Sequence, residues 1–277
     1  MDATRRAALA ERAARAGGVV AREQFRAELD VETKAHENDF VTETDREAQR
    51  QVLGTIRREF PDDALVVEEQ ALPPGTDPGT VDLRESVPGT GAAWVVDPID
   101  GTGNFVRGIR FWATSVAAVV DGKPVGVATA LPAEGDVYAA GPESVTRNGS
   151  ALSVSDRTDP GTFAVGLVGW WPMRQDGRFA GLVGAAGDRF GDLRRLGSMQ
   201  GTLALVADGG LEAAVTPASP HPWDALAGVH LVRRAGGTAT DLRGNPWRHD
   251  SEGLVVSNGT AHDAVLASVR EAAASGE

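Results

Sequence analysis

The chain of 277 residues is 42% hydrophobic, so it can bury a large core, either as one large domain or as two lobes of ordinary size. It has no cysteine, which excludes disulfides, thiolate metal sites and cysteine nucleophiles. Its net charge of −12 disfavours nucleic acid as a partner, although a bound cation can reverse the field around a small phosphorylated substrate.

The first segment is rich in Ala, Arg and Glu, and its apolar residues recur at helical spacing, which predicts a helix over residues 3–28. The pair Gly17-Gly18 is expected to be a weak point inside this helix. The segment lacks the apolar core of an export signal, and no apolar run approaches the roughly 20 residues that span a bilayer. We therefore expect a cytoplasmic protein without a membrane partner.

The next polar stretch, residues 32–45, predicts a loop in which Thr44 and Asp45 form the N-cap of a second helix. That helix is expected to continue to Phe60, where a proline stops it. A short strand is then predicted over residues 64–67, with Glu68-Glu69 at its carboxyl end. Residue pairs of this kind are often only a solvated surface, but α/β proteins also place site residues at such strand ends.

A central motif follows a loop over residues 70–91, which is rich in Pro, Gly and Asp and predicts a mobile flap or a disordered insert. After a predicted buried strand over residues 92–96, Asp97 and Asp100 bring two carboxylates to one place. Gly101 allows close backbone approach, and Thr102 offers an N–H and a hydroxyl. This pattern suits a hard cation that holds a phosphate, while a simple type I turn is the alternative for the isolated motif.

The remainder of the chain shows two different patterns of predicted secondary structure. Apolar runs at 112–120 and 125–131 around Asp121-Gly122 predict a hairpin, and a strand at 136–140 extends a largely antiparallel sheet. Beyond about residue 158, predicted strands and helices alternate, which is typical of an α/β unit. We therefore expect an α+β lobe over residues 1–157 and an α/β lobe over residues 158–277.

Four motifs in this order resemble the signature of the inositol monophosphatase family, between about residues 30 and 258. They are the Thr42–Asp45 element with Lys34 upstream, Glu68-Glu69, the Asp97–Thr102 motif, and Trp223-Asp224. The resemblance implies a layered α/β/α/β/α sugar-phosphatase sandwich with two lobes and the site between them. It also implies a homodimer that hydrolyses small phosphate monoesters with Mg²⁺ and is inhibited by Li⁺.

The resemblance implies a role for each matching residue. One Mg²⁺ would be held by Glu68, Asp97 and the Ile99 carbonyl, a second by Asp97, Asp100 and Asp224, and a third, looser ion by Asp45. Catalysis would rest on Glu68, Asp97 and Thr102. Substrate contacts would come from Lys34, Asp100, Gly101, Thr102, Ser198 and Asp224. Two cations can together neutralise a phosphate dianion, activate water and stabilise a leaving alkoxide, and all-oxygen ligands favour Mg²⁺ over zinc.

The substrate is less determined than the reaction. The resemblance points to an inositol-1-phosphate or fructose-1,6-bisphosphate phosphatase, and histidinol phosphate and 3′-phosphoadenosine 5′-phosphate are alternatives. Pro217 stands where inositol-selective members carry a glutamate, so we expect a broad specificity. A non-catalytic phosphosugar-binding regulator is the alternative from another class, but such a protein would be expected to have lost a metal ligand. His221, Trp170-Trp171 and Arg194-Arg195 have structural explanations as good as functional ones.

Overall fold

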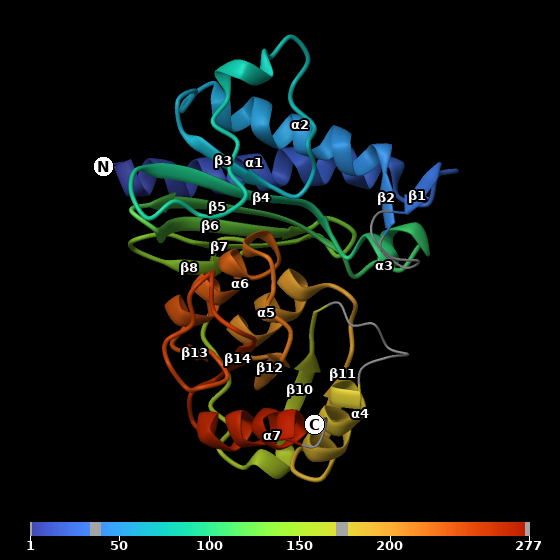
Figure 1. Cartoon of the computed structure of the whole chain (residues 1–277), viewed down its shortest axis with the longest axis vertical. Helices are drawn as coiled ribbons and strands as arrows, with labels where there is room; N and C mark the ends of the chain where they lie inside the picture. Colours follow the sequence, from blue (N-terminus) through green and yellow to red (C-terminus); the bar gives the residue numbers. More distant parts are fainter. Residues whose placement is uncertain (1, 34–39, 170–176, 275–277) are drawn as a thin grey trace.

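The computed structural model describes residues 2–33, 40–169 and 177–274, which form five stacked layers (Figure 1). Helices α1 and α2 cover one face of a seven-stranded sheet, and α5 and α6 lie between that sheet and a five-stranded sheet. Helices α4 and α7 cover the far face of the second sheet. The predicted α/β class with its layered sugar-phosphatase arrangement is confirmed. In the described part of the chain, no helix is long and apolar enough to cross a membrane.

The first layer pairs α1 (Asp2–Gln24) with α2 (Glu43–Arg57). The expected weak point in α1 is wrong, because the helix runs through Gly17 and Gly18 without interruption. A Cβ atom at Gly17 would lie 2.5 Å from Val52 of α2, and one at Gly18 would lie 2.7 Å from Pro132. The two glycines therefore let α1 pack closely on its neighbours, and that packing offsets their low helix propensity.

The start of α2 also differs from the prediction. Strands β1 (Val31–Thr33) and β2 (Phe40–Thr42) form a small antiparallel sheet, and Thr42 is the N-cap of the helix. Asp45 lies three residues inside, and its carboxylate accepts hydrogen bonds from the Thr42 N–H at 2.9 Å and the Thr42 hydroxyl at 2.6 Å. This reciprocal arrangement of the capping box moves the helix start two residues upstream of the predicted one.

The seven strands of the large sheet lie in their chain order: β3 (Ala64–Val67), β4 (Ala92–Asp100), β5 (Ala113–Val120), β6 (Lys123–Leu131), β7 (Asp136–Ala140), β8 (Val145–Arg147) and β9 (Ser150–Ala151). Only the β3–β4 pair is parallel among them. The predicted hairpin is confirmed, since Asp121 and Gly122 both have positive φ between β5 and β6. Along β4, Trp94 and Val96 pack towards α1 and α2, while Ala93 and Val95 pack towards α5 and α6.

Residues 70–91 contradict the prediction of a disordered insert. The Leu65 N–H donates to the Asp82 carbonyl and the Arg84 N–H donates to the Leu65 carbonyl, both at 2.8 Å. The segment contains a short 3₁₀ helix, η1 (Pro78–Thr80), and buries Val87. It therefore covers the free edge of β3, which explains why so irregular a composition is tolerated beside a parallel strand.

The second sheet has the order β11-β10-β12-β14-β13, from strands Asp192–Arg194, Ala164–Leu167, Ala213–Thr216, Leu254–Ser257 and Thr238–Thr240. The first three are parallel to one another, and the other two pair antiparallel. Helices α5 (Met199–Ala207) and α6 (Pro222–Arg234) lie on one face, and α4 (Gly177–Gly187) and α7 (His262–Ala274) lie on the other (Figure 1). A short helix, η2 (Pro160–Thr162), precedes β10, and α3 (Thr102–Val106) follows β4 in the first sheet.

Candidate metal centre

The site is built around the end of β4, where the strand leaves the regular ladder. Asp97 pairs with Ser115 of β5, and the register then shifts before Asp100 pairs with Ala113. The Thr114 hydroxyl donates to the Pro98 carbonyl at 2.7 Å, so the displaced turn stays attached to the next strand. Irregular strand ends of this kind re-aim side chains that would otherwise alternate across the sheet.

Three carboxylates from two distant parts of the chain meet at this turn. Each of Asp97, Asp100 and Asp224 offers an oxygen within 4.8 Å of the oxygens of the other two. Asp97 and Asp100 come from β4, and Asp224 comes from the first turn of α6, where Pro222 opens the helix. A cluster of hard oxygen ligands at this spacing can hold a divalent cation such as Mg²⁺.

Asp97 is the most buried member, with 1% of its surface exposed. Burial raises the pKa of Asp97 well above its usual value, and the negative charges of Glu68, Asp100 and Asp224 raise it further. Its Oδ1 atom has no hydrogen-bond partner within the part of the chain that the structure describes. An orphaned buried carboxylate oxygen surrounded by other acids fits a cation, which would supply the missing partner and the missing positive charge.

Glu68 reaches the cluster from the neighbouring strand. It follows β3 directly, and its N–H donates to the Val96 carbonyl at 3.2 Å, which extends the parallel β3–β4 pairing by one residue. The negative charge of its side chain is one of the causes of the raised Asp97 pKa. The sequence therefore places this glutamate beside Asp97 through strand register alone.

Asp100 has a second set of partners on α5. Ser198, the N-cap of α5, donates its hydroxyl to Asp100, and the backbone N–H groups of Met199 and Gln200 donate at 3.0 and 2.7 Å. Burial raises the pKa of Asp100 to about 6, and these hydrogen bonds hold it from rising further. A carboxylate of β4, in the first sheet, thus caps α5, which lies in the helical layer between the two sheets.

Asp45 and Thr102 form a hydrogen-bonded pair at the edge of the cluster. The Thr102 hydroxyl lies 3.1 Å from an Asp45 carboxylate oxygen and 3.0 Å from the Ile99 carbonyl oxygen. Burial raises the pKa of Asp45 to about 7, with Glu68 and Glu69 adding to the shift and Thr42 opposing it. A carboxylate with a pKa near neutrality and a hydroxyl in contact with it can together accept a proton from a reacting water.

Gly101 lies where the end of β4 approaches the start of α5 closely. Its φ of 91° lies in the left-handed region, and a Cβ there would stand 2.9 Å from the Gly197 carbonyl oxygen and 3.1 Å from the Ser198 Cβ. Nearby, the Asn104 side chain donates to the Phe111 and Leu196 carbonyls at 2.7 Å each, which ties α3 to the start of α5. Only glycine at position 101 permits this approach.

The other predicted residues fall into two groups. Lys34 and Trp170-Trp171 lie outside the described residues. His221 is exposed at the N-cap of α6 and stacks on Trp223 with ring centroids 4.7 Å apart, and Arg194 forms an ion pair with Asp192. Pro217 is followed by a turn in which the Ala218 N–H donates to the Thr216 hydroxyl at 3.1 Å. His221 and Arg194 therefore each have a structural contact of their own.

Two buried glutamines that support the site were not predicted from the sequence. Gln49 accepts from the Glu69 N–H at 3.0 Å and donates to the Glu69 and Ala71 carbonyls. Gln200 contacts the backbone of α6 beside Asp224. Gln49 follows Asp45 by one helical turn, so a shared helix face was a usable signal. No such signal exists for Gln200, whose partners are backbone groups of another helix.

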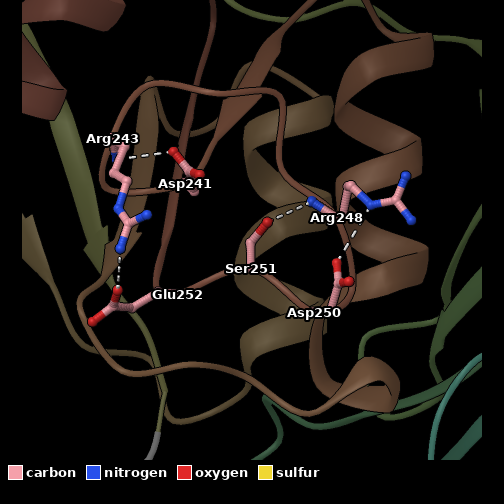
Figure 2. Close-up of a pocket in the computed structure, with 6 residues that line it drawn as sticks. All are labelled: Asp241, Arg243, Arg248, Asp250, Ser251 and Glu252. Carbon is pink, nitrogen blue, oxygen red and sulfur yellow. Dashed lines mark hydrogen bonds and ion pairs between the residues drawn. The ribbon is translucent and has the colours of Figure 1, made fainter.

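The described surface has two hollows, of which one lies beside the site. One, of about 450 Å³, lies against Glu68 and Glu69 and is bounded on its other side by β1 and by Arg46 and Arg50 of α2. The other lies in the segment between β13 and β14 and is lined by none of Asp97, Asp100 and Asp224 (Figure 2). Its charged groups are engaged with one another, as Arg243 pairs with Glu252 and Arg248 pairs with Asp250. Of the predicted site residues, Glu68 lines the first hollow, and none lines the second.

Comparison with known proteins supports one family. The sequence pattern of the inositol monophosphatase family matches residues 2–274. The chain is 34% identical over 242 residues to "Fructose-1,6-bisphosphatase/inositol-1-monophosphatase" of Thermotoga maritima, with 87% of this chain and 86% of that protein covered. It is 29% identical over 266 residues to "Nus factor SuhB" of Escherichia coli, with 95% of both covered.

Solved structures agree. An inositol monophosphatase of Thermotoga maritima superposes with a TM-score of 0.83 at 28% identity, covering 96% of this chain and 97% of that one. The inositol monophosphatase of Anabaena, at 22% identity and a TM-score of 0.81 over 98% and 97% of the two chains, supports the fold alone. The chain therefore belongs to the inositol monophosphatase family and is a phosphoric monoester hydrolase.

Proposed function

We propose that the carboxylate cluster binds two or three Mg²⁺ ions and that the protein hydrolyses small phosphorylated sugars or polyols. The observation that carries the proposal is the meeting of Asp97, Asp100 and Asp224 within 4.8 Å, with a buried Asp97 oxygen that lacks a hydrogen-bond partner among the described residues. Glu68, Asp97 and the Ile99 carbonyl would hold one ion, Asp97, Asp100 and Asp224 a second, and Asp45 a third. When bound, the ions supply positive charge that offsets the phosphate dianion and stabilises the leaving alkoxide.

The chain's own groups would move the proton and orient the substrate. Water attacks phosphorus, the bond from phosphorus to the ester oxygen breaks, and one proton of the water ends on the departing oxygen, so the products are the alcohol and inorganic phosphate. We assign the orientation of that water to Glu68 and Thr102, and the Thr102 hydroxyl can pass a proton to Asp45, 3.1 Å away. Backbone N–H groups of Gly101 and Thr102 would bind the phosphate, and Asp100, Ser198 and Asp224 would contact the alcohol.

The substrate range is proposed to be broad. The family resemblance implies that inositol-selective members carry, at the position of Pro217, a glutamate that accepts hydrogen bonds from ring hydroxyls. A charged hydrogen bond of this kind is worth about 1.5–3 kcal/mol, so its absence reduces discrimination by roughly 10- to 150-fold. We expect kcat/KM to vary by no more than about tenfold among inositol-1-phosphate, glycerol-2-phosphate and the 1-phosphate of fructose-1,6-bisphosphate.

Release of inorganic phosphate from a panel of monoesters tests both statements. The panel should include histidinol phosphate and 3′-phosphoadenosine 5′-phosphate, and each assay should be run with Mg²⁺ and with excess chelator. Full turnover in chelator would overturn the metal assignment, and no turnover of any ester would favour a phosphosugar-binding regulator. A preference above about a hundredfold for inositol-1-phosphate would show that another residue reads the ring.

The homodimer and the cytoplasmic location stay predictions, since they follow from the resemblance and the composition. Sedimentation of the purified chain measures the first. The name of the relatives called Nus factor SuhB refers to transcription. For this chain, the net charge of −12 disfavours direct contact with nucleic acid.

A further inference from the structure

Gln200 is a fully buried glutamine in the first turn of α5, at the contact between α5 and α6. Its Nε2 donates to the Trp223 carbonyl at 2.5 Å, and its Oε1 accepts from the Gly228 N–H at 2.8 Å. These two backbone groups lie on either side of Asp224, one in the preceding residue and one about a helical turn later. The amide therefore holds the first turn of α6 at both ends of the segment that carries Asp224.

The same residue also contacts a second carboxylate of the cluster. The backbone N–H of Gln200 donates to Asp100 Oδ2 at 2.7 Å. Asp100 belongs to β4 in the first sheet, whereas Asp224 begins a helix next to the second sheet. Gln200 thus connects, through three hydrogen bonds, the two carboxylates that come from different parts of the molecule.

Helix packing makes this connection possible. A Cβ at Gly228 would lie 2.5 Å from the Leu203 Cβ and 2.9 Å from the Gln200 Oε1. Glycine at that position lets α6 approach α5 closely enough for the amide to reach the backbone. A buried amide cannot hydrogen-bond to bulk water, so it must find its partners within the protein. The Gln200 side chain finds them in the backbone of α6.

We propose that Gln200 is a positioning residue, which fixes Asp224 relative to Asp100 and thereby sets the affinity of the cluster for a divalent cation. It acts through its neighbours and is assigned no contact with substrate. The inference rests on the proposed function, because it assumes that the cluster is the metal site. Removal of a residue that orients a metal ligand costs about 10- to 100-fold in metal affinity.

The decisive variant is Gln200→Met, which keeps the length of the side chain and removes both of its hydrogen bonds. Mn²⁺ binding to the full-length protein should be measured by electron paramagnetic resonance, and phosphate release should be measured as a function of Mg²⁺ concentration. We expect at least one Mn²⁺ site to weaken by about tenfold or more, and half-saturation by Mg²⁺ to rise in proportion. At saturating Mg²⁺, kcat should change much less, because the ligands themselves are intact.

The control is Ser268→Ala, which removes a buried hydrogen bond of 2.7 Å to the Val265 carbonyl on α7. It is expected to lower Tm without altering Mn²⁺ affinity. If Gln200→Met fails to fold, Gln200→Asn keeps the amide but is one methylene too short to bridge the helices, and the same weakening is expected. A folded Gln200 variant that binds Mn²⁺ like the wild type would overturn the inference. A wild-type protein that binds no Mn²⁺ would instead overturn the proposed function.

Discussion

Asp97 and Asp100 end a strand that has neighbours on both sides, whereas Asp224 begins a helix that lies between the two sheets. The strand end is held by ladder hydrogen bonds and by the Thr114 hydroxyl, and its two aspartates are only three positions apart in the sequence. The helix start is held by the side-chain amide of Gln200, from a different helix. One half of the site is therefore fixed by local sequence and strand pairing, and the other by helix packing. Substitutions in the first half should change the chemistry directly, while those in the second should act through spacing.

The largest expected effect belongs to the strand half. Asp97→Asn removes a buried charge that would be shared by two cations, and we expect kcat to fall by at least about 10³-fold. Steady-state kinetics at saturating Mg²⁺ measure it. Asp192→Asn, which changes an exposed aspartate of β11 in the same way, should leave kcat unchanged. Activity of Asp97→Asn above about a tenth of wild type would show that the strand half is not dominant.

The next effect concerns the point where the two halves touch. Gly101→Ala brings a Cβ to 2.9 Å from the Gly197 carbonyl at a φ of 91°, so the Asp100 turn or the start of α5 must shift. We expect kcat/KM to fall by about 10²-fold, which is typical of a displacement near 1 Å. Gly108→Ala is the matched control, because its φ is also positive at 70° but its nearest atoms lie 3.5 Å away. Equal losses in both variants would attribute the effect to backbone strain alone.

A smaller effect compares the two buried glutamines. Gln49→Met removes the amide that holds the backbone of Glu69, but Glu68 keeps its hydrogen bond to the Val96 carbonyl through strand pairing. We therefore expect half-saturation by Mg²⁺ to rise by only about threefold, less than for Gln200→Met. Titrations of activity with Mg²⁺ for the two variants, carried out in parallel, measure the difference. If half-saturation by Mg²⁺ rose more for Gln49→Met than for Gln200→Met, the strand half of the site would depend more on a buried amide than the helix half does.

The last effect is on stability and not on catalysis, and it depends on pH. Asp45 has a pKa of about 7 in the folded protein against 3.8 as its ordinary value, so its contribution to stability is complete below about pH 4. Without metal, that contribution is lost as the pH rises through 7, by roughly 4 kcal/mol at most. The Tm of Asp45→Asn minus that of the wild type should therefore increase from pH 5 to pH 8. Mg²⁺ should reduce this increase, and a difference independent of pH would contradict the raised pKa.

Much of the first half of the site was accessible from the sequence. Asp97, Asp100 and Gly101 sit within one short motif after an apolar strand, so a single local pattern brings them together. Glu68 was singled out because it directly follows an apolar strand, and the parallel pairing of that strand with β4, which the sequence did not predict, brings it beside Asp97. The hairpin at Asp121-Gly122 likewise depended on one turn whose residues tolerate positive φ.

The remaining features depend on contacts between distant segments. The cap that Asp100 provides for α5 joins residues about 100 positions apart, and no local pattern encodes it. The partners of Gln200 are backbone groups, which every sequence contains. Gly17 was interpreted by its helix propensity, but its neighbour Val52 of α2 decides its role. The start of α2 was missed because both Thr42 and Thr44 are acceptable N-cap residues, and only the contact of Asp45 with Thr42 distinguishes them.

The cap on α5 has a consequence for how the protein responds to events far from its site. Asp100 accepts hydrogen bonds from the Ser198 hydroxyl and from the N–H groups of Met199, Gln200 and Gly201, so the proposed cation and the docking of α5 would share one carboxylate. If the cluster binds a cation as proposed, thermodynamic linkage requires that whatever shifts α5 relative to the first sheet changes cation affinity, and that cation binding changes the docking of α5 by the same free energy. The proposed metal centre would then also respond to how the two sheets are joined, and substitutions at that junction would change its affinity without altering a ligand.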